Sequence, residues 1–179
     1  FGDQKGALGY TKEAFIAPRG MKERVDFWRD IYAKYTTSQG VIHDSVYVDV
    51  IYDTVDFTAI AKDQTLSDRQ KRKARESLIK EKRKVIEDRL RRLQGVTTAE
   101  GLTGEDLRYF KMFETVNNPR KFIEATENGR IRFQLGQKDR FYLGLYYSGR
   151  YLNRIEKIFQ EEGVPLELTR LPFVESSYN

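Results

Sequence analysis

The stretch that decides the fold runs from Ser67 to Gly95 and reads SDRQKRKARESLIKEKRKVIEDRLRRLQG. It contains no proline, and its single glycine is the last residue. Ser67 or Asp68 can cap a helix at its start, and Gly95 can end it. We therefore predict one helix of about 27 residues, roughly 40 Å long. A thin apolar stripe at helical spacing marks its buried side: Leu66, Ala74, Leu78, Val85, Ile86, Leu90 and Leu93.

This helix also carries the positive charge of the chain. Residues 69–92 contain 12 Lys/Arg and 4 Asp/Glu, a net charge of +8, whereas all 179 residues together carry +5. Three interpretations stay open for the basic helix 69–92: a solvated structural helix, contact with phosphates, anionic lipid or an acidic polymer, and nucleic-acid binding. The segment holds no aromatic residue. It therefore offers no platform on which bases could stack, which argues against nucleic acid.

Upstream of the basic helix, over residues 41–58, the residue pattern repeats every two positions, as in a β-strand. Val46, Val48 and Val50 alternate with Tyr47 and Asp49, and the segment is rich in β-branched and aromatic residues. We predict one or two strands, with a hairpin turn at 43–45. No other segment gives a convincing β signal.

The remaining segments predict helices joined by short breaks. We expect helices over 22–36, from Thr103, from Pro119, over 137–162 as one long helix, and from Pro165 toward Glu175. Residues 1–20 are glycine-rich and predict an extended arm. The predicted fold is mainly α: a helical, bundle-like region over 21–128 with a β element near 41–58, followed by a further region over 129–179.

Composition excludes several classes of protein. The chain has no Cys and one His, so it offers no disulfide, no thiolate metal site and no cysteine nucleophile, and we expect no metal and no cofactor. No run of about 18 apolar residues is present, so we predict no transmembrane helix. The chain opens on Phe1 without Met and without an export signal, so we expect a processed or engineered product.

Two groups of residues suggest chemistry without settling it. His43 next to Asp44 resembles a base with its carboxylate, but a structural histidine at a turn is the interpretation we favour, because no nucleophile motif accompanies the pair. A cluster of tyrosines could line a sugar-binding surface or simply pack in the core with hydrated hydroxyls. The cluster comprises Tyr142, Tyr146, Tyr147 and Tyr151.

The C-terminal residues carry a resemblance to a known family. Residues 163–179 read GVPLELTRLPFVESSYN, and residues 132–155 upstream contain RFQLGQKDRF, then GL, SGRYL and I. The two segments closely resemble the start of the catalytic module of lytic murein transglycosylases, which are glycoside hydrolases of the goose-type-lysozyme-like class, and most of all the membrane-bound D subgroup. Residues 22–60 are similar to the helical segment that precedes this module. The resemblance therefore implies a mainly α fold that leads into a lysozyme-like catalytic domain.

The resemblance also implies a reaction and the residues that perform it. The family cleaves the β-1,4 bond between N-acetylmuramic acid and N-acetylglucosamine in peptidoglycan and forms a 1,6-anhydro ring. Glu175 matches the single catalytic acid/base, and Ser176, Tyr178 and Asn179 match positions that bind substrate or hold the carboxyl group. Leu171 to Val174 precede Glu175, so we expect apolar surroundings that favour its protonated form.

The resemblance further implies that the catalytic domain continues beyond Asn179, with a Gly-Leu-(Trp/Met)-Gln segment and further helices that build the sugar groove. We therefore expect residues 129–179 to be the start of that domain, and residues 1–179 alone to be inactive. The implied partners are peptidoglycan glycan strands and the rest of the catalytic domain, with the basic helix 69–92 available for contact with the cell envelope and no nucleic acid. The implied location is the bacterial periplasm or cell envelope.

Two alternatives to the enzyme remain. One is a non-catalytic helical scaffold that binds peptidoglycan or a partner protein; the other, less favoured, is a nucleic-acid binder.

The apolar residues of the C-terminal segment predict how this segment is packed. Residues 164–179 should fold onto the face formed by Phe141, Leu145 and Leu152, or be covered by another chain.

Overall fold

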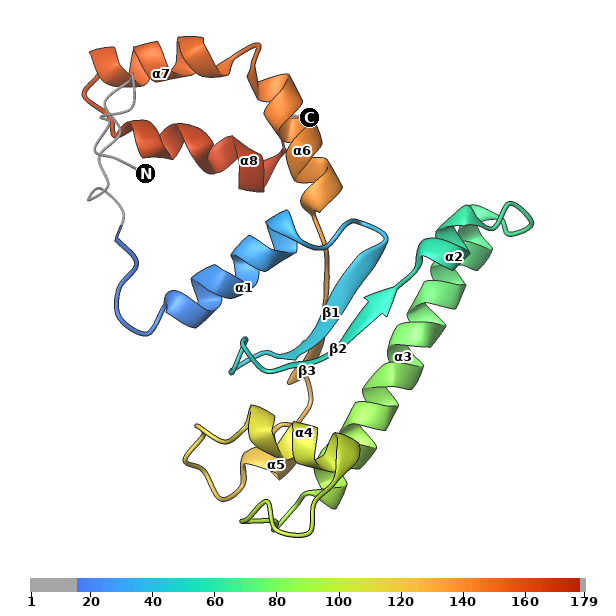
Figure 1. The fold of residues 1–179 in the computed structure, drawn as a ribbon. Coiled ribbons are helices and arrows are strands. Elements are labelled where there is room, and N and C mark those ends of the chain that lie inside the picture. The colour runs from blue at the N-terminus through green and yellow to red at the C-terminus, as the bar shows by residue number, and fades with distance from the viewer. Residues whose placement is uncertain (1–15, 178–179) are drawn as a thin grey trace. The chain divides into compact units, whose positions relative to one another are not determined.

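The computed structural model describes residues 16–177, which divide into two compact units. The first unit joins the two ends of the chain, 1–34 and 137–179, and the second is the continuous segment 35–136. This division places residues 21–34 with the C-terminal part, and does not follow the expected boundary at 128. Both units are largely helical, and the second also contains a small sheet, so the described protein is mainly α (Figure 1). Of the expected arm 1–20, residues 1–15 lie outside the described residues.

A three-stranded antiparallel sheet forms the centre of the second unit. Its strands are β1 (Gln39–Asp44), β2 (Ile51–Asp56) and β3 (Ile131–Leu135), in the order β2-β1-β3. The turn between β1 and β2 spans 45–50, so the expected hairpin turn at 43–45 and the strand over the alternating valines are wrong. The cause is Asp44, whose Oδ1 accepts hydrogen bonds from the backbone N–H groups of Val46 and Tyr47 at 2.8 and 2.9 Å. This side chain holds the backbone in a turn where the residue pattern alone favours a strand.

The third strand corrects the prediction that 41–58 holds the only β element. Ile131, Phe133 and Leu135 alternate with polar residues, and all three pack against the core of the second unit. The strand is only five residues long and has no local partner. It pairs with β1, about ninety residues earlier in the chain. Such a distant pairing leaves no signal in a short window of sequence.

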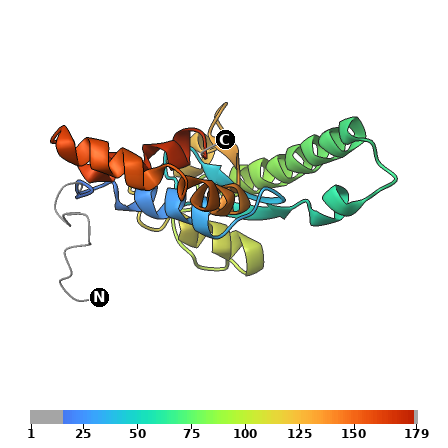
Figure 2. The same cartoon turned by 90° about the horizontal axis from the view of Figure 1, so that it is seen from above.

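Four helices complete the second unit: α2 (Thr58–Lys62), α3 (Asp68–Arg92), α4 (Gly104–Met112) and α5 (Lys121–Glu124). The long helix predicted from Ser67 to Gly95 is confirmed as α3. Ser67 and Gln70 form a capping box, in which each side chain bonds the other residue's backbone N–H. Helix α2 lies beside the N-terminal half of α3 (Figure 2), where Lys71 donates a hydrogen bond to the Ala61 carbonyl.

The core of the second unit lies between the sheet and α3, α4 and α5, and is not the core of a helical bundle. Aromatic rings dominate it: Tyr52 stacks on Tyr109 with 5.8 Å between ring centroids, and Phe113 lies edge-on to Phe122 at 5.4 Å. From α3, Ile86 and Leu90 are buried in this core. Of the stripe predicted for the C-terminal half of the long helix, Ile86, Leu90 and Leu93 are buried, but the prediction is wrong for Val85, which is 52% exposed.

The first unit contains α1 (Lys22–Ala33), α6 (Lys138–Ser148), α7 (Leu152–Glu161), the 3-10 helix η1 (Leu166–Arg170) and α8 (Leu171–Glu175). The single helix predicted over 137–162 is wrong, because it breaks between α6 and α7. The Ser148 hydroxyl donates to the Leu145 carbonyl at 2.8 Å, and Gly149 follows directly. A serine that bonds back to its own helix and a glycine both weaken helix continuation. No helix within residues 16–177 is long and apolar enough to cross a bilayer.

Candidate functional site

Of the residues singled out by the sequence, Glu175 and Ser176 lie at the end of α8. Pro172 stands in the first turn of this short helix, where its missing N–H is not needed, and Glu175 is its last helical residue. The Glu175 side chain is exposed. Ser177, just beyond, has a φ of 53°, the left-handed conformation that commonly ends a helix. The carboxyl group of Glu175 therefore stands at the solvent-facing end of a tightly terminated helix.

Helix α8 is held against α6 by one aromatic contact and one close backbone approach. The Phe173 side chain is 4% exposed, and its ring lies 5.5 Å from that of Phe141. At Gly144 of α6, a Cβ atom would lie 3.0 Å from the carbonyl oxygen of Ser177. Any side chain at Gly144 would thus press on the chain two residues after Glu175. The predicted folding of residues 164–179 onto the face that contains Phe141 is confirmed for Phe173.

An ion pair fixes the other side of the α8 segment. Arg170 Nη2 lies 2.7 Å from Glu156 Oε1, and this links α7 to the residue that immediately precedes α8. The Glu156 side chain is 2% exposed and that of Arg170 is 40% exposed. A carboxylate so deeply buried is stable only when it is paired. We did not predict this pair from the sequence, although Glu156 interrupts the apolar stripe of Leu152, Ile155 and Phe159, and that is the signal that could have revealed it.

Two apolar hollows flank α8 within the first unit. The α1 hollow measures about 580 Å³ and is lined mainly by Val25, Trp28, Arg29, Tyr32, Ala33, Phe141 and Val174. The α7 hollow measures about 480 Å³ and is lined by Phe141, Leu145, Ser148, Leu152, Arg170, Phe173 and Val174. Phe141 of α6 and Val174 of α8 belong to both linings, so these two helices together form the wall that the two hollows share. Glu175 follows Val174 directly along this wall.

The other residues expected at the site are placed as follows. The Ser176 hydroxyl donates to the Pro172 carbonyl at 3.3 Å, so in this arrangement its proton is directed to the backbone of α8. Tyr178 and Asn179 lie outside the described residues. The apolar surroundings expected for Glu175 are not supplied by residues 16–177, in which its side chain is exposed.

The tyrosines of α6 lie mostly on the surface of the first unit. Tyr142 and Tyr146, one turn apart on α6, are 59% and 72% exposed, and Tyr151, which directly precedes α7, is 53% exposed. The Tyr147 ring is half-buried; it lies edge-on to Tyr146 at 5.6 Å, with the Arg150 guanidinium above it. Core packing, the simpler of the two interpretations, is therefore wrong for Tyr142, Tyr146 and Tyr151. More than half of each of these three side chains is accessible to a ligand, although the Lys138 ammonium lies over the Tyr142 ring, 6.0 Å from its centroid.

His43 and Asp44 belong to the second unit, and the structure does not arrange them as a catalytic pair. The Nδ1 atom of His43 lies 2.9 Å from the backbone carbonyl oxygen of Asp44, so it is the protonated nitrogen of the neutral ring. The Asp44 carboxylate is fully buried, binds Arg130 at 2.9 Å and accepts a hydrogen bond from the Tyr52 hydroxyl at 3.0 Å. Burial, followed by the nearby Asp44 charge, raises the pKa of Tyr52. This network is structural: it fixes the turn after β1.

No cluster of three or more His, Asp or Glu side chains that could hold a metal ion is present among residues 16–177. Comparison of the chain with protein-family models, with curated proteins and with solved structures gave no match.

Proposed function

We propose that the chain is part of a peptidoglycan lytic transglycosylase in which Glu175 is the catalytic acid/base. The observation that carries the proposal is the segment LTRLPFVESSYN over 168–179, which resembles the catalytic segment of that family. The geometry supports it: α8 is fixed by Phe173 and Arg170, yet its terminal carboxyl group is accessible to a large polymeric substrate. An exposed glutamate on a well-held helix end suits a reaction on a glycan strand.

The proposed reaction uses one carboxyl group twice. Protonated Glu175 donates its proton to the glycosidic oxygen as the bond from that oxygen to the muramoyl C1 breaks. The resulting carboxylate then accepts the proton of the muramoyl C6 hydroxyl, whose oxygen bonds to C1 and closes the 1,6-anhydro ring. Because the attacking oxygen comes from the substrate, neither water nor a second carboxylate is required.

The proposal includes a partner for the exposed apolar residues around α8. Leu171 and Val174 are each 52% exposed, and both belong to the segment that resembles the first part of the catalytic domain. The helices that follow this segment in the family are the proposed cover, and with them the apolar environment that Glu175 needs. The proposed location is the periplasm or cell envelope, where peptidoglycan lies.

The test is the Glu175→Gln variant of the full-length enzyme. It preserves shape and removes proton transfer, so formation of 1,6-anhydro products from purified sacculi should fall about 10²–10⁴-fold. The matched control is Glu162→Gln, which makes the same change at an exposed residue just after α7. Anhydro product formed by Glu175→Gln at the rate of the control would refute the assignment.

A non-catalytic peptidoglycan-binding module is the second candidate, and the exposed tyrosines of α6 favour it. Flat aromatic faces stack on pyranose rings, and Tyr142 and Tyr146 present two such faces about 6 Å apart along the helix axis. Residues 1–179 should then co-sediment with sacculi. Replacing both tyrosines by Ser should weaken binding about tenfold, whereas replacing both by Phe should preserve it. Equal binding by the Ser and Phe variants would exclude this surface.

A further inference from the structure

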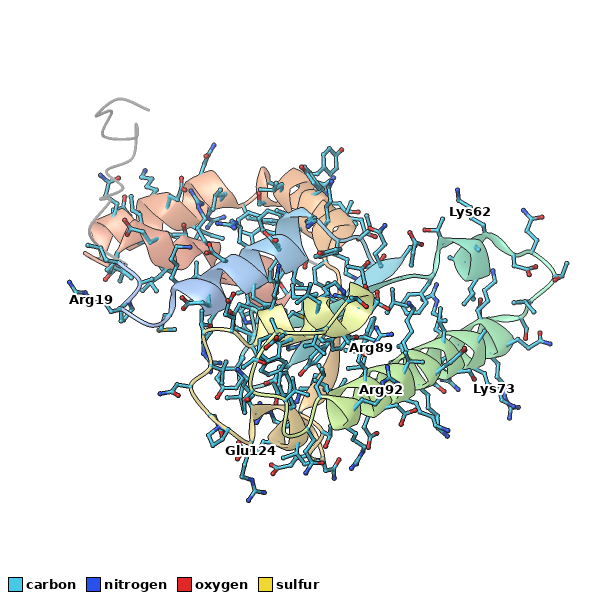
Figure 3. All side chains as sticks on the ribbon, turned by 60° about the horizontal axis from the view of Figure 1, so that its bottom comes forward. Arg19, Lys62, Lys73, Arg89, Arg92 and Glu124 are labelled. Carbon is cyan, nitrogen blue, oxygen red and sulfur yellow. The ribbon has the colours of Figure 1, made fainter. Side chains whose placement is uncertain are left out.

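The long helix α3 of the second unit presents a continuous positive surface that the proposed reaction does not use. Between Arg72 and Arg91, six exposed cations lie within an arc of about 120° on this helix, over a length of about 28 Å. We name them the basic face: Arg72, Lys73, Lys80, Arg83, Lys84 and Arg91. Figure 3 shows Lys73 extending outward from α3. Ile86 and Leu90, which are buried in the core, lie toward one edge of this arc, in line with Arg72, whereas all six cations of the basic face are exposed to solvent.

Only two carboxylates lie within the same arc, and each is paired to a cation of the basic face. Glu76 Oε1 lies 4.0 Å from Arg72 Nε, and Glu87 Oε1 lies 2.6 Å from Arg91 Nη2. The other four cations, at positions 73, 80, 83 and 84, form no ion pair with a residue in 16–177. The basic face therefore carries a net charge of about +4.

We propose that the basic face binds the phosphate groups of an anionic phospholipid surface. The face is convex and straight, so it cannot enclose a small anion. It matches a partner that offers negative charge at every point along its length, as a lipid surface does. The exposed arc contains only charged side chains. Binding is thus electrostatic, without apolar insertion, and depends steeply on salt.

Duplex DNA fits the same helix less well. Glu81 and Asp88 lie on one flank of the basic face. A DNA groove surrounds a bound helix, so its phosphates would come close to these two carboxylates and repel them. A flat surface contacts the basic face alone. The arc also offers no Asn, Gln or aromatic residue with which to contact bases. DNA and peptidoglycan are therefore alternatives that the experiment has to exclude.

The experiment measures co-sedimentation of residues 1–179 with phosphatidylcholine vesicles, with and without phosphatidylglycerol. Duplex DNA and purified sacculi serve as competitors for the vesicles. The test variant changes the residues at 73, 80, 83 and 84 to Gln, a good helix former, and circular dichroism checks that α3 persists. The control variant neutralises four exposed cations elsewhere and has the same net charge: Arg24→Gln, Lys111→Gln, Arg140→Gln and Arg154→Gln.

Binding should require phosphatidylglycerol and disappear at high salt. The test variant should bind about 10²–10³-fold more weakly than the unchanged chain, whereas the control variant should lose less than about tenfold. Three results would each overturn the proposal. The two variants could lose vesicle binding equally, the chain could bind to pure phosphatidylcholine, or low concentrations of DNA or sacculi could displace it from the vesicles. If the test variant does not fold, the lipid and salt dependence of the unchanged chain still decides it.

Discussion

At the scale of single residues, the buried carboxylate of Glu156 is the most consequential side chain that the sequence did not single out. Glu156→Gln removes the 2.7 Å ion pair between this carboxylate and the Arg170 guanidinium. Because Arg170 is 40% exposed, water compensates in part, and the loss of unfolding free energy should be about 1–3 kcal/mol. Urea denaturation of residues 1–179 measures it.

The neighbouring residue provides the control for Glu156. Lys157 pairs with Glu161 at 3.8 Å on the surface, where both side chains are exposed, so Lys157→Gln should cost less than about 0.5 kcal/mol. If the two variants unfold at the same urea concentration, the buried pair does not hold α7 to the α8 segment in the way described here.

His43 predicts a pH dependence of stability. Burial lowers the pKa of His43 below its usual 6.5, and the Arg132 charge also lowers it, although the Asp44 carbonyl and carboxylate act in the opposite direction. Below pH 6.5 the unfolded chain takes up a proton that the folded chain resists, so the histidine's contribution to stability is complete above that pH and falls as the pH drops toward the folded pKa.

The measurement compares the free energy of unfolding of the unchanged chain and of His43→Gln between pH 7.5 and 5, at which His is the side chain that ordinarily titrates. The unchanged chain should lose stability over this range, and the variant should lose less. Parallel curves would show that His43 titrates alike in the folded and unfolded states.

At the scale of elements, the contact between α6 and the end of α8 predicts a separation of activity from stability. A methyl group at Gly144 would lie 3.0 Å from the Ser177 oxygen, so the segment after Glu175 has to move by a few tenths of an ångström. Alanine also favours the helix by roughly 1 kcal/mol, which offsets the strain. In the proposed full-length transglycosylase, Gly144→Ala should therefore reduce kcat on sacculi about tenfold with little change in Tm.

Gly149→Ala is the matched control for this contact. Its Cβ would lie 3.5 Å from the nearest carbonyl oxygen, an ordinary contact, and its backbone is helical. This variant should retain full activity. A Gly144→Ala enzyme that is as active as Gly149→Ala would show that Ser177 does not transmit position to the proposed catalytic carboxyl group.

Helices and strands that depend on residues close together in the chain were predictable from the sequence. Those that depend on residues far apart in the chain were not. The helix α3 follows from its capping box and its apolar stripe, both of which lie within 30 residues. The strand β3 depends on β1, far away in the chain, and the turn after β1 depends on one aspartate side chain. For the candidate site, the motif pointed to Glu175, whereas the interruption of the apolar stripe at Glu156 indicates a buried charge without identifying Arg170 as its partner.

At the scale of the whole molecule, we predict that residues 1–179 alone do not cleave peptidoglycan. Glu175 is exposed, and the two hollows beside α8 are apolar, so the surface next to this carboxyl group neither holds a sugar ring in place nor shields the reaction from water. Incubation of sacculi with protein of verified mass should release no 1,6-anhydro product. Turnover by this protein would mean that the first unit builds far more of the active site than the exposed carboxyl group suggests.

The first unit is built from both ends of the chain, and this has a consequence for the order of folding. During synthesis, residues 35–136 are complete before α6 emerges, and they contain every strand of their sheet. The chain leaves the first unit after residue 34 and returns to it at residue 137. Pairing of Gly40 with Leu135 brings these two points of the chain close together and closes a loop of about a hundred residues. We therefore expect the second unit to fold first. Once it has folded, α1 and α6 are already close together, so their packing no longer requires the closure of a long loop.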